Sequence, residues 1–124
     1  MLTGHAHNYE RSYPLRYNEA SPGKPLITDH DKFQYLNATG TVFTIVGTGG
    51  ESIQRVDKKP FLASIYEGFG CLNVQINGGS LSAEFYSPDG KTIDHFAIVK
   101  NHKGHEGFDA MNSLHQVVYT KPVK

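Results

Sequence analysis

Apolar and polar residues alternate with a period of two through residues 69–99, the pattern of strands with one buried face. The apolar positions that predict the buried face are Leu72, Val74, Ile76, Leu81, Ala83 and Phe85. Polar positions assigned to the opposite face include Asn73, Gln75 and Glu84. Asn77-Gly78 and Ser87-Pro88-Asp89-Gly90 interrupt the pattern with turn sequences. The segment therefore predicts an antiparallel meander whose third strand covers residues 92–99.

The first half of the chain has a less regular pattern. Residues 41–46 are rich in β-branched and aromatic side chains and predict a strand buried on both faces, which the glycine-rich residues 47–50 end. Residues 4–25 are polar and broken by proline, which predicts a loop. In residues 51–68, Pro60 excludes a continuous helix and leaves a short helical turn near residues 62–66 open.

Composition narrows the class of protein. The chain has 124 residues, the length of one domain, and its 12 Lys and Arg balance 12 Asp and Glu. Binding to nucleic acid through phosphates is therefore not predicted. No apolar run approaches the roughly 20 residues that span a bilayer, and residues 1–5 lack the pattern of a signal peptide. Cys71 lies alone in an apolar strand, which excludes an intrachain disulfide and predicts a buried, unreactive thiol.

The candidate chemistry lies in Gly4-His5-Ala6-His7. In an extended backbone His5 and His7 point to the same side, and in a loop at a strand end they can reach two metal ions roughly 3.5–4 Å apart. Gly4 lets the backbone approach such a site closely. Glu10 and Arg11 are candidates for orienting the imidazoles through hydrogen bonds. For a bare His-x-His pattern, the competing interpretation is a surface loop with two solvated histidines.

The whole octet from Gly4 to Arg11 is more specific, because it resembles the Gly-His-x-His-x-Tyr-Glu-Arg signature of purple acid phosphatases and related calcineurin-like metallophosphoesterases. The resemblance continues in the Gly-x-Gly-Gly of residues 47–50, in Ser64 with Phe69-Gly70, and in Asp89-Gly90 with Asp94. It covers about residues 2–99. Residues 101–124 have no counterpart in that family.

The resemblance implies phosphoester hydrolysis at a centre of two divalent or trivalent metal ions, iron, zinc or manganese. His5 would bind the second metal and His7 the first, with Tyr9, Glu10 and Arg11 supporting them. The implied fold is the C-terminal half of an α/β (α+β) metallophosphoesterase sandwich, mostly antiparallel β with one or two short helices. Residues 1–99 would form this half-domain, and residues 100–124 a tail whose pattern fits a helix and a strand equally.

The chain departs from the family in its missing ligands. The family's other ligand motifs precede the signature, and only four residues precede His5 here. Asp29-His30-Asp31 stands after the signature, in a polar stretch that predicts a solvated loop. We therefore expect a fragment that begins within a core strand, binds at most one ion weakly and is inactive alone.

The rival hypothesis is a non-catalytic β-domain that associates with itself or with a complementary N-terminal half, because half a sandwich exposes the face that its other half would cover. A third, a carbohydrate- or ligand-binding β-module, depends only on the meander and the aromatic residues. The sequence predicts no membrane or nucleic-acid partner. It leaves the substrate, the metal and the cellular location open, although complete members of the family are often secreted.

Overall fold

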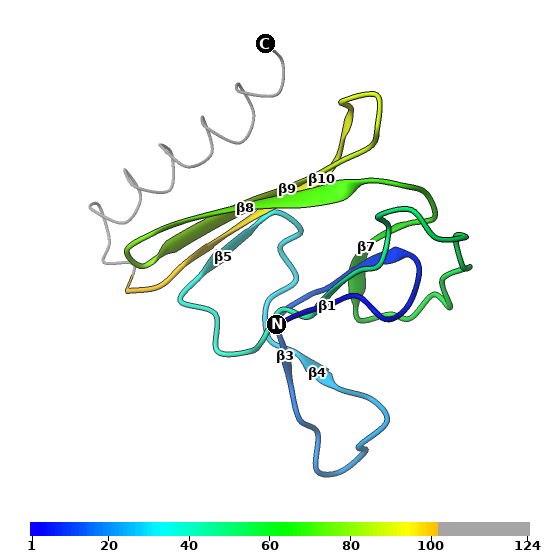
Figure 1. Cartoon of the computed structure of the whole chain (residues 1–124). Helices are drawn as coiled ribbons and strands as arrows, with labels where there is room; N and C mark the ends of the chain where they lie inside the picture. The colour runs from blue at the N-terminus through cyan, green and yellow to red at the C-terminus, as the bar shows by residue number, and fades with distance from the viewer. Residues whose placement is uncertain (102–124) are drawn as a thin grey trace.

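A computed structural model describes residues 1–101 of the chain (Figure 1). Within that range the secondary structure consists of ten strands, and no helix is present. No helix in this part of the chain is therefore long and apolar enough to cross a membrane. The strands are β1 (Leu2–Thr3), β2 (Tyr9–Ser12), β3 (Leu15–Arg16), β4 (Leu26–Ile27), β5 (Gln34–Leu36), β6 (Thr44–Val46), β7 (Leu62–Tyr66), β8 (Cys71–Asn77), β9 (Ser80–Tyr86) and β10 (Thr92–Val99).

Two four-stranded sheets form the layers of the structure, and the β3–β4 pair projects from their side (Figure 1). The first sheet has the order β1-β6-β2-β7, and only the β1–β6 pair in it is parallel. The second has the order β5-β10-β9-β8, and only the β5–β10 pair is parallel. Most strand pairs in the described residues are therefore antiparallel, as predicted. The assignment of these sheets to a metallophosphoesterase sandwich stays a prediction.

The predicted meander is confirmed, because β8, β9 and β10 are consecutive antiparallel neighbours. Asn77 pairs with Ser80 across the first turn, and Gly78 has a φ of 58°, a value that favours glycine. In the second turn, the Gly90 amide donates to the Ser87 carbonyl at 2.9 Å. Both turns therefore form at the sequences that predicted them.

The core lies between the two sheets. Phe85 is fully buried, stacks on Tyr9 with ring centroids 4.2 Å apart, and meets the edge of Tyr66 at 5.8 Å. The burial predicted for Ile76 is wrong, since its side chain is 72% exposed. Ile76 lies next to the turn on β8, an edge strand, where no facing strand covers it. Glu84, which the pattern assigns to the opposite face, is only 6% exposed, and its Oε2 accepts a hydrogen bond from Tyr86 Oη at 2.8 Å.

The structure corrects three further predictions. Residues 4–25 are not one loop, because β2 lies in the middle of the first sheet and β3 pairs with β4. The helical turn near residues 62–66 is wrong, since β7 pairs with β2 as an antiparallel strand. The strand predicted over residues 41–46 is limited to β6, and Phe43 before it is 43% exposed. The two structures left open for the tail lie outside the described residues.

Candidate functional site

The loop of residues 4–8, which carries both candidate histidines, lies where two parallel strands end. β1 and β6 run parallel with Leu2 opposite Thr44 and Thr3 opposite Ile45. Because the carboxyl ends of parallel strands meet at the same edge of a sheet, the loop after β1 and the loop after β6 lie next to each other. This edge therefore brings residues 4–8 together with residues 47–56.

Gly47 determines how closely these two loops approach. A Cβ atom at position 47 would lie 2.6 Å from the Gly4 carbonyl oxygen and would also collide with the Ala6 carbonyl oxygen. With glycine at this position, the Gly47 amide donates to the Asn8 carbonyl at 3.1 Å. The Asn8 amide in turn donates to the Ala6 carbonyl at 3.0 Å. The absence of a side chain at position 47 therefore permits the fold of the histidine loop.

The loop after β6 forms hydrogen bonds with both the main chain and the imidazole ring of His7. The His7 amide donates to Gln54 Oε1 at 2.9 Å, and the Gln54 amide donates to the His7 carbonyl at 2.8 Å. His7 Nδ1 lies 3.2 Å from the Ser52 carbonyl oxygen. Because a carbonyl oxygen only accepts, this hydrogen bond places the proton of a neutral His7 imidazole on Nδ1 and its lone pair on Nε2. His7 is thus held in the tautomer that binds a metal through Nε2.

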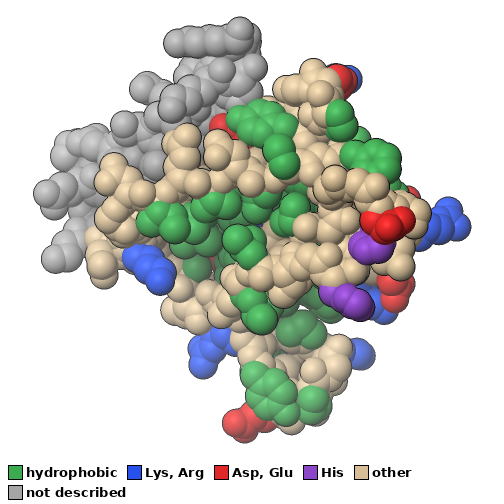
Figure 2. Space-filling view, viewed as in Figure 1, with side chains coloured by type: hydrophobic (Ala, Val, Ile, Leu, Met, Phe, Trp, Pro, Cys, Tyr) green, Lys and Arg blue, Asp and Glu red, His purple; other side chains and the backbone are tan. Residues whose placement is uncertain are grey.

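His5 is exposed and His7 is half-buried. Figure 2 shows histidine side chains at the surface of this face, near acidic side chains. Within residues 1–101, however, no three His, Cys, Asp or Glu side chains are grouped closely enough to hold a metal ion. Within this range, therefore, no third side chain of these types completes a metal site with His5 and His7.

Asp29-His30-Asp31 has a structural use in its loop. Asp29 Oδ1 accepts the Asp31 amide at 2.9 Å, and Asp31 Oδ1 accepts the Phe33 amide at 2.8 Å. The His30 ring lies beside Tyr13, with centroids 5.9 Å apart. These carboxylates hold the turn that leads into β5.

The side chains of Arg11 and Tyr9 point into the space between the two sheets, where they form hydrogen bonds with buried side chains. Tyr9 Oη donates to Asp94 Oδ2 at 2.6 Å. Arg11 donates from Nε to Asp94 Oδ2 at 2.6 Å and from Nη2 to Asp94 Oδ1 at 2.9 Å. Its Nη1 donates to Tyr35 Oη at 2.7 Å, and Nη2 also reaches the Lys32 carbonyl at 2.9 Å. All three guanidinium nitrogens are therefore engaged between the sheets, and the role of Arg11 in orienting the imidazoles stays a prediction.

The surroundings of these side chains favour a charged Arg11 guanidinium beside Asp94 and a neutral Tyr9 phenol. Burial raises the pKa of Tyr9, and the charge and hydrogen bond of Asp94 raise it further, beyond the lowering effect of Arg11. Burial acts to lower the pKa of Arg11, but the hydrogen bond and charge of Asp94 outweigh it and hold the pKa above its ordinary value. The sequence pattern did not assign Asp94 as the partner of Arg11.

Glu10 points to the opposite side of β2 from its two neighbours and stays a candidate. Burial raises the pKa of its carboxyl, a hydrogen bond from Asn8 lowers it, and the charge of Asp57 raises it. Asn8 is 3% exposed, and its Oδ1 has no hydrogen-bond partner among the described residues. Asn8 Nδ2 donates to the Arg55 carbonyl at 3.5 Å and the charge of Asp57 acts on Glu10, so both residues lie near the segment that follows Gln54.

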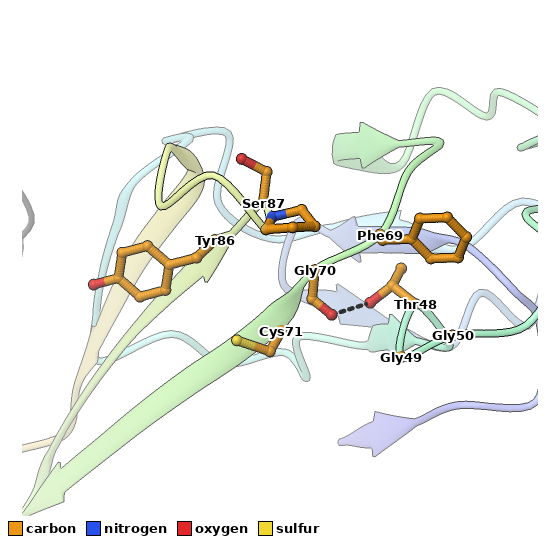
Figure 3. A pocket seen from close by; sticks show the side chains of 9 residues that line it. Thr48, Gly49, Gly50, Phe69, Gly70, Cys71, Tyr86 and Ser87 are labelled. Carbon is orange, nitrogen blue, oxygen red and sulfur yellow. Dashed lines mark hydrogen bonds between the residues drawn. The ribbon is translucent and has the colours of Figure 1, made fainter.

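An open groove of about 500 Å³ begins at the glycine-rich loop after β6 (Figure 3). Thr48 Oγ1 donates to the Gly70 carbonyl at 2.8 Å and joins the loop to the start of β8. Cys71 is exposed on the groove wall, so the prediction of a buried thiol is wrong. It lies at the first residue of an edge strand, where the facing sheet does not cover it. The lining residues are Thr48, Gly49, Gly50, Phe69, Gly70, Cys71, Tyr86, Ser87 and Pro88.

Comparison with known proteins gives a relative with a phosphoesterase-type name. The chain is 30% identical over 118 residues to a protein of Hordeum vulgare named nucleotide pyrophosphatase/phosphodiesterase. The alignment covers 90% of this chain and 28% of that protein, so the chain spans little more than a quarter of the relative's length. No protein-family profile and no solved structure match the chain. The narrower resemblance to purple acid phosphatases stays a prediction.

Proposed function

We propose that this chain supplies two histidine ligands, His5 and His7, to the dinuclear metal centre of a phosphoester hydrolase. The observation that carries the proposal is the loop that holds His7 with Nδ1 bonded to the Ser52 carbonyl and Nε2 available. The name of the Hordeum vulgare relative supports the same class of reaction. The substrate we propose is a phosphoester, and the metals are iron, zinc or manganese.

The donor chemistry fits such a centre, because imidazole suits zinc and iron, while manganese favours additional oxygen ligands. When bound, a pair of metal ions supplies an activated water and neutralises charge on the phosphate. The residues of this chain would hold and orient the ions. The Gln54 and Ser52 contacts fix the direction of His7, and Gly47 fixes the loop that carries His5. Glu10 is the acidic side chain nearest to them along the chain.

The two imidazoles form an incomplete ligand set. A dinuclear hydrolase centre takes about six or more protein ligands, including a carboxylate between the ions. Two neutral ligands would leave the charge of the ions uncompensated. We propose that the remaining ligands come from polypeptide other than residues 1–101, and that the chain alone is inactive.

A chimera tests the proposal. This chain replaces the segment of the Hordeum vulgare protein with which it aligns, and phosphodiester hydrolysis is measured with added metal. We expect the chimera to be active and His5→Ala or His7→Ala to remove activity. His30→Ala, which changes a histidine in another loop, should leave it unchanged. A folded but inactive chimera, or one indifferent to His5 and His7, would contradict the proposal.

A second candidate function, a non-catalytic β-domain that associates with itself or with a complementary half, has its own supporting observation. β1 is an edge strand, and the exposed fractions of Met1, Leu2 and Ile76 are 69%, 60% and 72%. Figure 2 shows apolar side chains gathered across the face that holds β1, β5 and β8 in Figure 1. A cavity of about 70 Å³ opens between the sheets there, lined by Met1, Leu2, Val42, Thr44, Val74, Leu81, Phe96 and Ile98. Such a face favours association.

The molecular mass in solution distinguishes the two candidates. Association through this face predicts an oligomer whose mass does not depend on divalent metal, and which Leu2→Glu with Ile76→Glu converts to a monomer. A monomer under all conditions would contradict self-association. A mass that rises only with metal would favour the metal centre.

A further inference from the structure

The outer edge of β7 forms a groove that the proposed hydrolase site does not use. β7 is the last strand in the order β1-β6-β2-β7 and, among the strands of residues 1–101, pairs only with β2. A groove of about 340 Å³ is lined by four consecutive residues, 62–65. Because successive side chains of a strand point to opposite faces, a groove that meets all four runs along the strand edge.

Three lysines line the same groove, Lys32, Lys58 and Lys59. The main chain of Lys32 is held by Arg11, whose Nη2 donates to the Lys32 carbonyl at 2.9 Å. The main chain of Lys59 is held by the Leu62 amide, which donates to the Lys59 carbonyl at 3.1 Å. The main chain at two of the three lysines, Lys32 and Lys59, is therefore held in place.

The groove is positively charged, although the whole chain has no net charge. Lys59 Nζ pairs with Asp57 at 2.8 Å, but the exposed fractions of the two side chains are 49% and 84%. A pair this exposed to solvent is weak and easily exchanged. Among the described residues that line the groove, none is acidic. Three lysines thus line the edge of a strand that pairs on one side only among the described strands, an arrangement that suits an anionic, extended ligand.

We infer that β7 accepts an extended acidic peptide as an additional strand. The peptide backbone would hydrogen-bond to the open edge of β7, and its carboxylates would meet Lys32, Lys58 and Lys59. The same lysines oppose pairing between two copies of this edge, because that would place six ammonium groups together. The β7 edge thus disfavours pairing with the β7 edge of a second chain and favours a negatively charged partner.

The test measures binding of a fluorescein-labelled octapeptide of alternating Glu and Val to the full chain by anisotropy at low salt. We expect saturable binding that weakens with added salt. Lys32→Glu with Lys58→Glu should weaken it by about tenfold or more. The control is Lys24→Glu with Lys91→Glu, which changes the net charge equally at exposed positions outside the groove. Circular dichroism confirms that both double variants fold.

A peptide N-methylated at every residue separates strand addition from simple charge attraction. It keeps the carboxylates but loses the amide donors on both edges, and we expect it not to bind. Absence of binding by the unmodified peptide, equal loss in both double variants, or full binding by the N-methylated peptide would each overturn the inference.

Discussion

The guanidinium of Arg11 and the carboxylate of Asp94 form a bidentate pair across the two sheets, with both side chains almost completely buried. Arg11 comes from β2 and Asp94 from β10, 83 residues later in the chain. The guanidinium also lies over the Phe96 ring, 4.7 Å from its centroid. This pair therefore joins the beginning and the end of the described fold.

Replacement of Asp94 by Asn should destabilise the protein by about 3–5 kcal/mol, because it leaves a buried guanidinium without its counter-charge. The free energy of unfolding in urea measures the change. Asp57→Asn is the matched control, since its pair with Lys59 is exposed and should contribute about 1 kcal/mol or less. Similar losses in the two variants would contradict the importance given to the buried pair.

Phe85→Ala should cost about 3–5 kcal/mol, because it removes a fully buried ring that stacks on Tyr9 and contacts Tyr66. Phe43→Ala offers a comparison with a phenylalanine that is 43% exposed, and it should cost far less. Urea unfolding measures both. A loss below about 1 kcal/mol for Phe85→Ala would mean that the packing between the sheets is not as described.

Stability should fall in alkali as the pH rises from about 10 to about 12. Burial raises the pKa of Tyr35 to about 12, despite the lowering effect of Arg11, whereas a phenol in the unfolded chain titrates near 10. The folded state therefore keeps a proton that the unfolded state releases across this range. Unfolding in urea at stepped pH should show a shallower decline for Tyr35→Phe than for the wild type. An unchanged slope would contradict the assignment.

The isolated chain should take up at most one zinc or manganese ion weakly through His5 and His7. Calorimetry compares the wild type with the His5→Ala, His7→Ala double variant, and His30→Ala is the control. Uptake should weaken in acid, because only neutral imidazole binds the metal. Equal uptake by the wild type and the double variant would remove these two histidines from the site.

The isolated chain should not hydrolyse an aryl phosphate above the level of buffer with metal. The reason is the absence, within residues 1–101, of any group of three metal-binding side chains. Release of the aryl alcohol, followed by absorbance, is the measurement. Metal-dependent turnover by this chain, lost in His7→Ala, would show that a complete site assembles within the chain or between its copies.

The C-terminal half of the described fold could be predicted because its signals are local. The Asn77-Gly78 turn and the alternating residues on both sides of it require no information from elsewhere in the chain. β2 was missed for the opposite reason. Its buried positions include Arg11, a charged residue that enters a core only with a counter-charge, and Asp94 is distant in sequence.

A signal for that pairing was nevertheless present in the predicted third strand. Asp94, Phe96 and Ile98 are two residues apart and therefore share one face of the strand, so the pattern places a carboxylate on the inward face of β10. An inward-facing Asp94 needs a buried counter-charge, and Arg11 is a candidate for it. The contacts of His7 with Ser52 and Gln54 carry no such signal, because they depend on how two loops meet.

The close approach at Gly47 also has a consequence for the order in which the molecule is assembled. The histidine loop takes its shape from a residue about forty positions later in the chain, after β1 and β6 have paired. Closing such a long loop costs entropy before any contact compensates for it. A synthetic peptide with the octet alone would therefore have the right side chains but none of their arrangement. The geometry of the two imidazoles belongs to the folded chain and not to the motif.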